Sequence, residues 1–90
     1  MNYDMAKFGS NITSDENAGK IVDEILEIFG KNESIDLDFK SISLMTTTAA
    51  KEIFKPIVDK YGLEKISKKI RFCNVAEDLK IVISTAIDNL

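Results

Sequence analysis

Apolar residues in this chain recur with two periods that alternate along the sequence, and this alternation constrains the fold more than any other feature. Segments with a period of two, typical of strands, precede segments with the three- and four-residue spacing of amphipathic helices. Strands are expected over residues 2–8, 34–39 and 68–74, and helices over residues 14–29 and 47–61, with a last helix after Asn74. Helical crossovers join parallel strands, so the sequence predicts an α/β fold: a small single-layer, mainly parallel sheet of three to four strands with helices packed on it.

Residues that favour helix ends mark the limits of the first and last helical segments. Thr13 followed by Glu16 is typical of a capping box, and Gly30 predicts the end of the first helix. Asn74 with Glu77 gives a second capping signature, which predicts the start of the last helix.

The second helix is predicted over residues 47–61, where apolar residues recur on one face. Gly62 supplies the exit from this helix. Pro56 lies inside it and removes a backbone donor, which predicts a kink. Residues 63–67 then predict a short helical turn.

The third strand, predicted over residues 68–74, is expected to direct Ile70 and Phe72 inward. Cys73 stands among apolar neighbours, which indicates a buried, inert thiol. It is the only cysteine, so no disulfide can form within the chain, and a reducing compartment is favoured.

Size and composition restrict the classes of function. A chain of 90 residues suffices for one core, so we expect a single domain over residues 1–90. The sequence contains no histidine, which excludes Ser–His and Cys–His catalysis and His-ligated metals within one chain. The four glycines are scattered and form no phosphate-binding loop. We therefore expect no enzyme activity, no catalytic residue, no metal and no cofactor.

Charge and hydropathy bear on partners and location. The formal net charge is −3, which disfavours nucleic acid as a partner. A local basic run with Lys65, Lys68, Lys69 and Arg71 leaves a nucleic-acid accessory role as an open alternative. Neither a signal peptide nor an apolar run of membrane-spanning length is present in the sequence, so we expect a cytoplasmic protein that does not contact membranes.

Asp36 and Asp38 are the only acidic residues arranged in a way that merits comparison with a catalytic pair. Residues two apart on a strand share one face, so both carboxylates face the same way. Nothing else in the sequence completes a catalytic or metal-binding set. We expect a solvated sheet face or a strand-end carboxylate that bonds loop amides.

Three consecutive threonines, Thr46, Thr47 and Thr48, stand where the second helix begins. One account is structural: one threonine caps the helix and the others fill the loop. The other is functional: a hydroxyl in the first helical turn lies beside unpaired amides, and a phosphate there changes the surface charge abruptly. A partner fitted to the unmodified helix end would then be repelled. On physical grounds alone, the residues favour the structural account.

The whole pattern resembles the STAS-like family of unknown function. A strand ends in Asp and Phe, a small-residue loop with a hydroxyl leads into the second helix, and a glycine turn, a strand ending in Asn and a last helix follow. The positions that carry the resemblance are Asp38, Phe39, Thr48, Ala49 or Ala50, Glu52, Phe54, Gly62 and Asn74.

That family is similar to the STAS domains of anti-sigma-factor antagonists, in which an Asp-Ser-Ser-Gly loop precedes the helix. There the second serine is phosphorylated by a kinase of the histidine-kinase-like ATPase superfamily, and the unmodified antagonist binds that kinase. Thr48 falls at the acceptor position, whereas Thr46 stands in place of the aspartate and Ala49 in place of the glycine.

The resemblance therefore implies a non-enzymatic regulatory domain that binds a protein partner of the histidine-kinase-like ATPase or anti-sigma-factor class. The expected phosphoacceptor is Thr48, with Thr47 beside it. The expected partner-binding residues are Leu44, Met45, Thr46, Thr47, Thr48, Ala49, Lys51 and Glu52. The alternative is a structural module without a phosphoswitch that forms a homodimer through a strand edge or a helix face.

Overall fold

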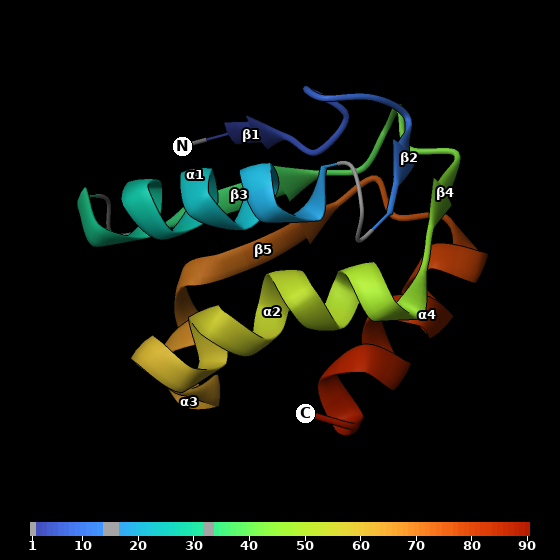
Figure 1. The fold of residues 1–90 in the computed structure, drawn as a ribbon. Coiled ribbons are helices and arrows are strands. Elements are labelled where there is room, and N and C mark those ends of the chain that lie inside the picture. The colour runs from blue at the N-terminus through green and yellow to red at the C-terminus, as the bar shows by residue number, and fades with distance from the viewer. Residues whose placement is uncertain (1, 14–16, 32–33) are drawn as a thin grey trace.

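The computed structural model describes residues 2–13, 17–31 and 34–90. Strands and helices alternate through most of the chain (Figure 1). In chain order, the elements are β1 (Asn2–Asp4), β2 (Asn11–Ile12), α1 (Ala18–Lys31), β3 (Ile35–Asp38), β4 (Leu44–Met45), α2 (Thr47–Tyr61), α3 (Leu63–Lys69), β5 (Ile70–Cys73) and α4 (Glu77–Asp88).

The main sheet has three parallel strands in the order β1-β3-β5, which confirms the predicted α/β fold. Leu37 of β3 lies opposite Tyr3 of β1 on one side and opposite Phe72 of β5 on the other. A second, two-stranded parallel sheet joins β2 to β4. This small sheet was not predicted, because its strands have two residues each and are too short to show a period.

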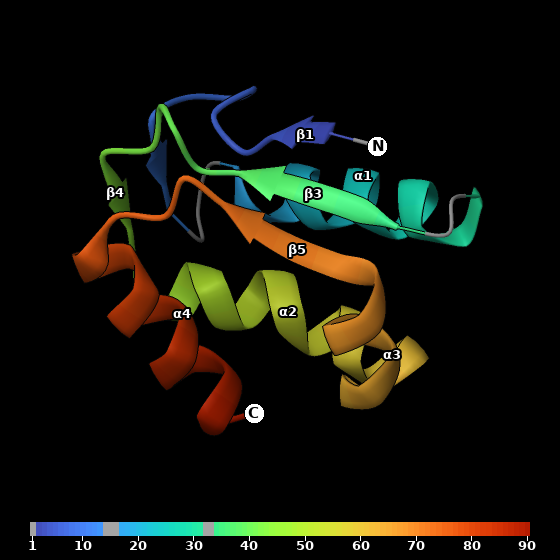
Figure 2. The same ribbon diagram turned by 180° about the vertical axis from the view of Figure 1, so that it is seen from behind.

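Helices cover one face of the main sheet. In Figure 1 α1 lies in front of β3 and α2 runs below β5, and the reverse view in Figure 2 has β3 in front of α1. The covered face carries buried residues such as Ile35, Leu37 and Ile70, while Asp36 and Arg71 lie on the opposite face. α2 packs against both α1 and α4, so it is the central helix of the core.

The first helix is shorter at its start and longer at its end than predicted. α1 begins at Ala18, and Glu16 of the predicted capping box lies outside the described residues. Buried Asn17 bridges the entry: its side chain accepts from the Thr13 amide at 2.9 Å and donates to the Asn11 carbonyl at 2.7 Å. The predicted stop at Gly30 is wrong, because the helix continues through it to Lys31.

The second helix has the predicted bounds, Thr47 to Tyr61, with Pro56 inside it; the kink stays a prediction. Gly62 ends the helix at φ +85°, and its amide donates to the Val58 carbonyl at 2.8 Å. A positive φ of this size favours glycine because it has no Cβ. α3 follows directly and confirms the short helix predicted there, two residues longer than expected.

The predicted cap of the last helix is wrong. α4 is preceded by Ala76 at the N-cap, with no side-chain cap bond. Asn74 instead adopts φ +56°, and its side chain donates to Asp38.

The inward orientation predicted for β5 holds for Ile70 and only in part for Phe72. The Phe72 ring contacts the rings of Phe39 and Phe54, with centroids 6.1 and 5.8 Å away, but it remains 38% exposed. Cys73 is half-buried, so the prediction of a fully buried thiol is wrong.

Candidate functional site at the β4–α2 junction

Thr46 begins α2, and so one of the three threonines is a helix cap. Its side-chain oxygen accepts from the Ala49 amide at 3.1 Å, and its carbonyl accepts from the Ala50 amide at 3.0 Å. Its own amide donates to the Ile12 carbonyl at 3.2 Å, which ties the start of α2 to β2. The position of this junction is therefore fixed from both sides.

Thr47 and Thr48 occupy the first turn of α2 and are not caps. Thr47 is half-buried and Thr48 is exposed. Neither hydroxyl has a hydrogen-bond partner among the described residues, and the same holds for the two backbone amides. The Thr48 hydroxyl is thus accessible beside the positive end of the helix dipole.

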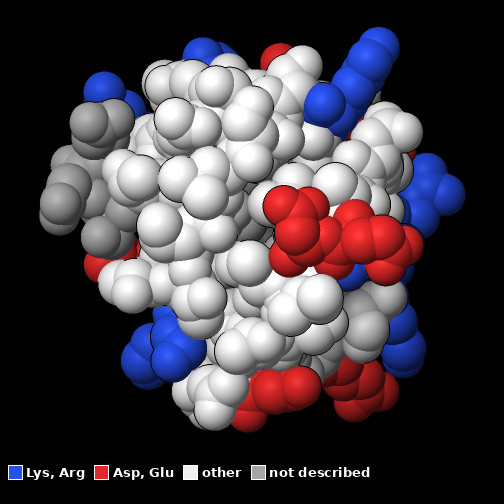
Figure 3. Space-filling view, turned by 90° about the vertical axis from the view of Figure 1, so that its right-hand side faces the viewer, with Lys and Arg blue, Asp and Glu red and all other residues white. Residues whose placement is uncertain are grey.

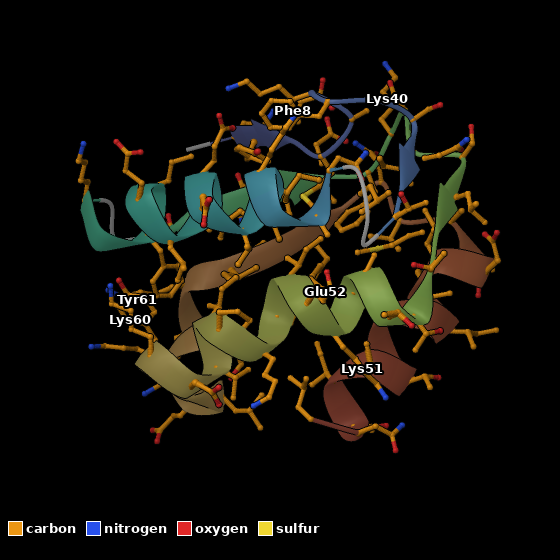
Figure 4. The ribbon with its side chains drawn as sticks, viewed as in Figure 1. Phe8, Lys40, Lys51, Glu52, Lys60 and Tyr61 are labelled. Carbon is orange, nitrogen blue, oxygen red and sulfur yellow. The ribbon has the colours of Figure 1, made fainter. Side chains whose placement is uncertain are left out.

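The other predicted partner-binding residues divide into exposed and buried. Leu44 is 51% exposed, Glu52 is exposed and Lys51 is half-buried. Lys51 and Glu52 leave α2 in different directions (Figure 4), as expected for successive helical residues. Met45 and Ala49, by contrast, are 2% and 0% exposed, so their side chains belong to the core and cannot contact a partner.

The surface around the junction carries few charges. Residues 41–50 and 9–13 contain no charged side chain. Figure 3 shows the corresponding side of the molecule as a mainly uncharged face, with acidic groups right of its centre and at its lower edge and basic groups around its margin. Lys51 and Glu52 are the first charged residues of α2. A charge introduced at Thr48 would therefore add to that of Glu52 on a surface that carries few charges.

Asp36 and Asp38 make the structural bonds expected of carboxylates on a sheet face. Asp36 accepts from Arg71 Nε at 2.7 Å and from Arg71 Nη2 at 3.0 Å across β3 and β5. Asp38 accepts from Asn74 Nδ2 at 3.0 Å and from the Lys40 amide at 2.9 Å. These bonds hold the pKa of each carboxyl below its ordinary value, chiefly through Arg71 for Asp36 and through Asn74 for Asp38.

The predicted basic run does not form one continuous patch. Lys68 lies 3.4 Å from Glu64, and Arg71 pairs with Asp36 on the exposed sheet face. Lys69 lies over the ring of Phe29, 5.6 Å from its centroid. Lys65 is exposed on α3 and lines a surface hollow together with Lys68. Lys65 and Lys68 thus share one surface, while Lys69 and Arg71 have other surroundings.

A groove between β5 and α4 was missed from the sequence. Its volume is about 710 Å³, and the residues that line it include Phe72, Asn74, Val75, Lys80, Ile83 and Ile87. The only sequence signal was an aromatic residue in the last strand. Whether that strand lies at the centre or at the edge depends on strand order, which the sequence did not define.

Two other kinds of site are absent from the described residues. None of the helices there is both long and apolar enough to cross a membrane. Over the same residues, no three Cys, Asp or Glu side chains come together in a group suited to a metal ion.

The fold and the junction define a class: a small α/β domain with a parallel sheet, helices on one face and a hydroxyl-rich strand-to-helix loop. Residues 17–80 match the family described as the STAS-like domain of unknown function (DUF4325). The chain belongs to this family, as the resemblance predicted. No curated protein and no solved structure shows a significant match.

Proposed function

We propose that this chain is a non-catalytic regulatory domain that binds a protein partner through Leu44, Thr48 and Glu52, with Lys51 at the margin of the contact. Phosphorylation of Thr48 ends the interaction. The observation that carries the proposal is the exposed Thr48 hydroxyl on the first turn of α2, which has no hydrogen-bond partner among the described residues and lies on a surface with few charges.

Leu44 supports a binding role for this surface. Its side chain is 51% exposed at the first residue of β4, three residues before α2 begins. Covering the exposed half of a leucine contributes about 1 kcal/mol to an interface. The uncharged residues around it can be desolvated at a lower cost than charged ones.

The position of Thr48 supports control by charge. It lies four residues before Glu52, so the two exposed side chains share one helix face. A phosphate on Thr48 adds about −1.5 to −2 charges at neutral pH. The free amides of the first turn stabilise this phosphate in the unbound protein. A partner that covers this surface would have to desolvate the phosphate, so modification weakens binding.

The resemblance to STAS domains gives the expected class of partner, a kinase or ATPase of the histidine-kinase-like superfamily. Such a partner both binds the unmodified helix end and modifies it. Thr47 is the neighbouring hydroxyl, and its half-buried position makes Thr48 the better acceptor.

Two exposed leucines provide a matched test of the surface. A tagged chain is recovered from its source cell as wild type, as Leu44→Asp and as Leu63→Asp; the two leucines are 51% and 53% exposed. We expect a partner that the wild type and Leu63→Asp retain and that Leu44→Asp loses. Equal recovery with both variants would place the interaction elsewhere and contradict the proposal.

A further inference from the structure

β5 has an open edge with unpaired backbone groups. It is the outermost strand of the β1-β3-β5 sheet. The Cys73 carbonyl accepts from the Phe39 amide at 2.9 Å, so Cys73 directs its backbone groups toward β3. Successive residues of a parallel strand direct these groups to alternate sides. The amide and carbonyl of Phe72 therefore point away from β3, where the described residues provide no strand to pair with them.

The opposite edge of the sheet is closed by its own chain. β1 has three residues, and the Asp4 carbonyl already accepts from the Lys7 amide at 3.1 Å. The Asp4 side chain accepts from the Ala6 amide at 2.9 Å. Short strands that end in a turn and carry a charge resist the addition of another strand. In the three-stranded sheet, as far as the structure describes it, β5 is therefore the more open of the two edges.

α4 turns the β5 edge into a groove. The helix starts beyond the carboxyl end of β5 and runs back beneath it (Figure 2). The groove of about 710 Å³ between them is lined on the apolar side by Phe72, Ile83 and Ile87. Phe72 is 38% exposed here, although its ring already contacts the core. One side is thus the open backbone edge of β5, and the other is a face of α4 that presents Ile83 and Ile87 together with polar residues.

Opposite charges stand at the two ends of the groove. Lys80 lines it near the start of α4 and Asp88 near its end. Eight residues of helix separate them by about 12 Å, roughly the span of four residues of an extended strand. The Lys80 ion pair with Glu77 is exposed and 3.4 Å long, so Lys80 can exchange it for another carboxylate.

We propose that this groove binds an extended peptide segment of a protein partner, which adds to β5 as a fourth strand. The backbone of the peptide pairs with Phe72, and an apolar side chain of the peptide enters the space between Phe72, Ile83 and Ile87. An acidic residue of the peptide lies beside Lys80 and a basic residue beside Asp88. This surface is distinct from the β4–α2 junction and does not depend on the role of Thr48.

A peptide fits the groove better than a second copy of the chain. One added strand needs about 5 Å beside β5. Pairing of two β5 edges about a two-fold axis perpendicular to the sheet would bring both α4 helices to the same face of the joined sheet. Each helix would then occupy the space below the partner strand.

The test is selection of a displayed library of random octapeptides on the immobilised full chain, followed by fluorescence anisotropy with the synthetic peptides recovered. Ser84 is exposed and lines the groove, so Ser84→Trp fills it without disturbing the core. Thr85→Trp is the matched control, since Thr85 is exposed on the same helix and is not among the groove-lining residues. A peptide N-methylated at alternate amides tests backbone pairing.

We expect peptides with alternating apolar residues and an acidic and a basic residue about four positions apart. Ser84→Trp and N-methylation should each weaken binding about tenfold or more, while Thr85→Trp has little effect. Failure to recover any peptide, or peptides that bind Ser84→Trp as tightly as wild type, would overturn the proposal. So would a wild-type dimer in light scattering that Ser84→Trp dissociates, because the occupant would then be a second copy.

Discussion

The side-chain oxygen of Thr46 accepts a hydrogen bond from the backbone amide of Ala49 at 3.1 Å, and this contact begins α2. Thr46→Ala removes the acceptor and is expected to lower the free energy of unfolding by about 1 kcal/mol. Thr48→Ala removes a hydroxyl with no such bond and should change it by less than about 0.5 kcal/mol. Urea unfolding followed by circular dichroism measures both. Equal losses would show that Thr48 also holds the start of the helix.

A negative charge at Thr48 should not destabilise the fold. Thr48→Glu places a carboxylate in the first turn of α2, where the helix dipole raises the free energy of unfolding by about 0.3–1 kcal/mol. Repulsion from Glu52, four residues further on, offsets about 0.2–0.5 kcal/mol of this gain. Thr85→Glu is the opposite control, because Thr85 is exposed in the last turn of α4 and a negative charge there is unfavourable. Thermal unfolding at low salt should give shifts of opposite sign. A loss of stability in Thr48→Glu would contradict the placement of Thr48.

Replacing glycine with alanine should change the free energy of unfolding in opposite directions at two positions. Gly62→Ala introduces a Cβ at φ +85° and is expected to lower the free energy of unfolding by about 1–3 kcal/mol. Gly19 is helical and nothing lies within 4 Å of an added Cβ, so Gly19→Ala should raise it by about 0.5 kcal/mol. Denaturant midpoints report both changes. A neutral Gly62→Ala would mean that the turn after α2 adopts another conformation.

Stability should fall in acid because of the carboxylates on the open sheet face. The folded-state pKa of Asp36 and of Asp38 lies below the ordinary value, through the bonds from Arg71 and Asn74. These two carboxylates therefore contribute fully to the free energy of unfolding above the unfolded-state pKa of about 3.9. The contribution is lost as the pH falls through the folded-state pKa. Urea midpoints should decrease over this interval.

Asp38→Asn provides the control for this pH dependence. The amide oxygen still accepts from the Lys40 amide, but the side chain no longer titrates. The decrease in the urea midpoint between about pH 5 and pH 2 should be smaller than in the wild type. An unchanged slope would assign the acid sensitivity to other carboxylates.

The sequence predicted the parts of the fold that have a strong local pattern. The spacing of Ile53, Phe54 and Ile57 defined α2, and the alternation of Ile35 and Leu37 defined β3, because burial acts on each side chain separately. The end of α1 was missed because Gly30 tolerates a helical conformation, and packing against α2 near Tyr61 extends the helix past it.

Features that depend on contacts between distant segments could not be predicted from local pattern. Asn74 resembles a helix cap, but the strand order brings it to Asp38, and it bonds that carboxylate instead. At the candidate site the sequence singled out the three threonines, but it did not show which of them caps α2 and which are exposed or half-buried. Which hydroxyl caps the helix depends on the residue at which α2 starts. Met45 is buried on β4, which pairs with β2, and Ala49 is buried among the core residues of α2.

The most direct test of the account is the dissociation constant of the captured partner for wild type, Thr48→Gln and Thr48→Glu. Gln adds bulk without charge, and Glu adds similar bulk with a negative charge. We predict that Thr48→Glu weakens binding by about tenfold or more, equivalent to about 1.4 kcal/mol, while Thr48→Gln stays close to wild type. Binding of Thr48→Glu with wild-type affinity would contradict control of this surface by charge at Thr48.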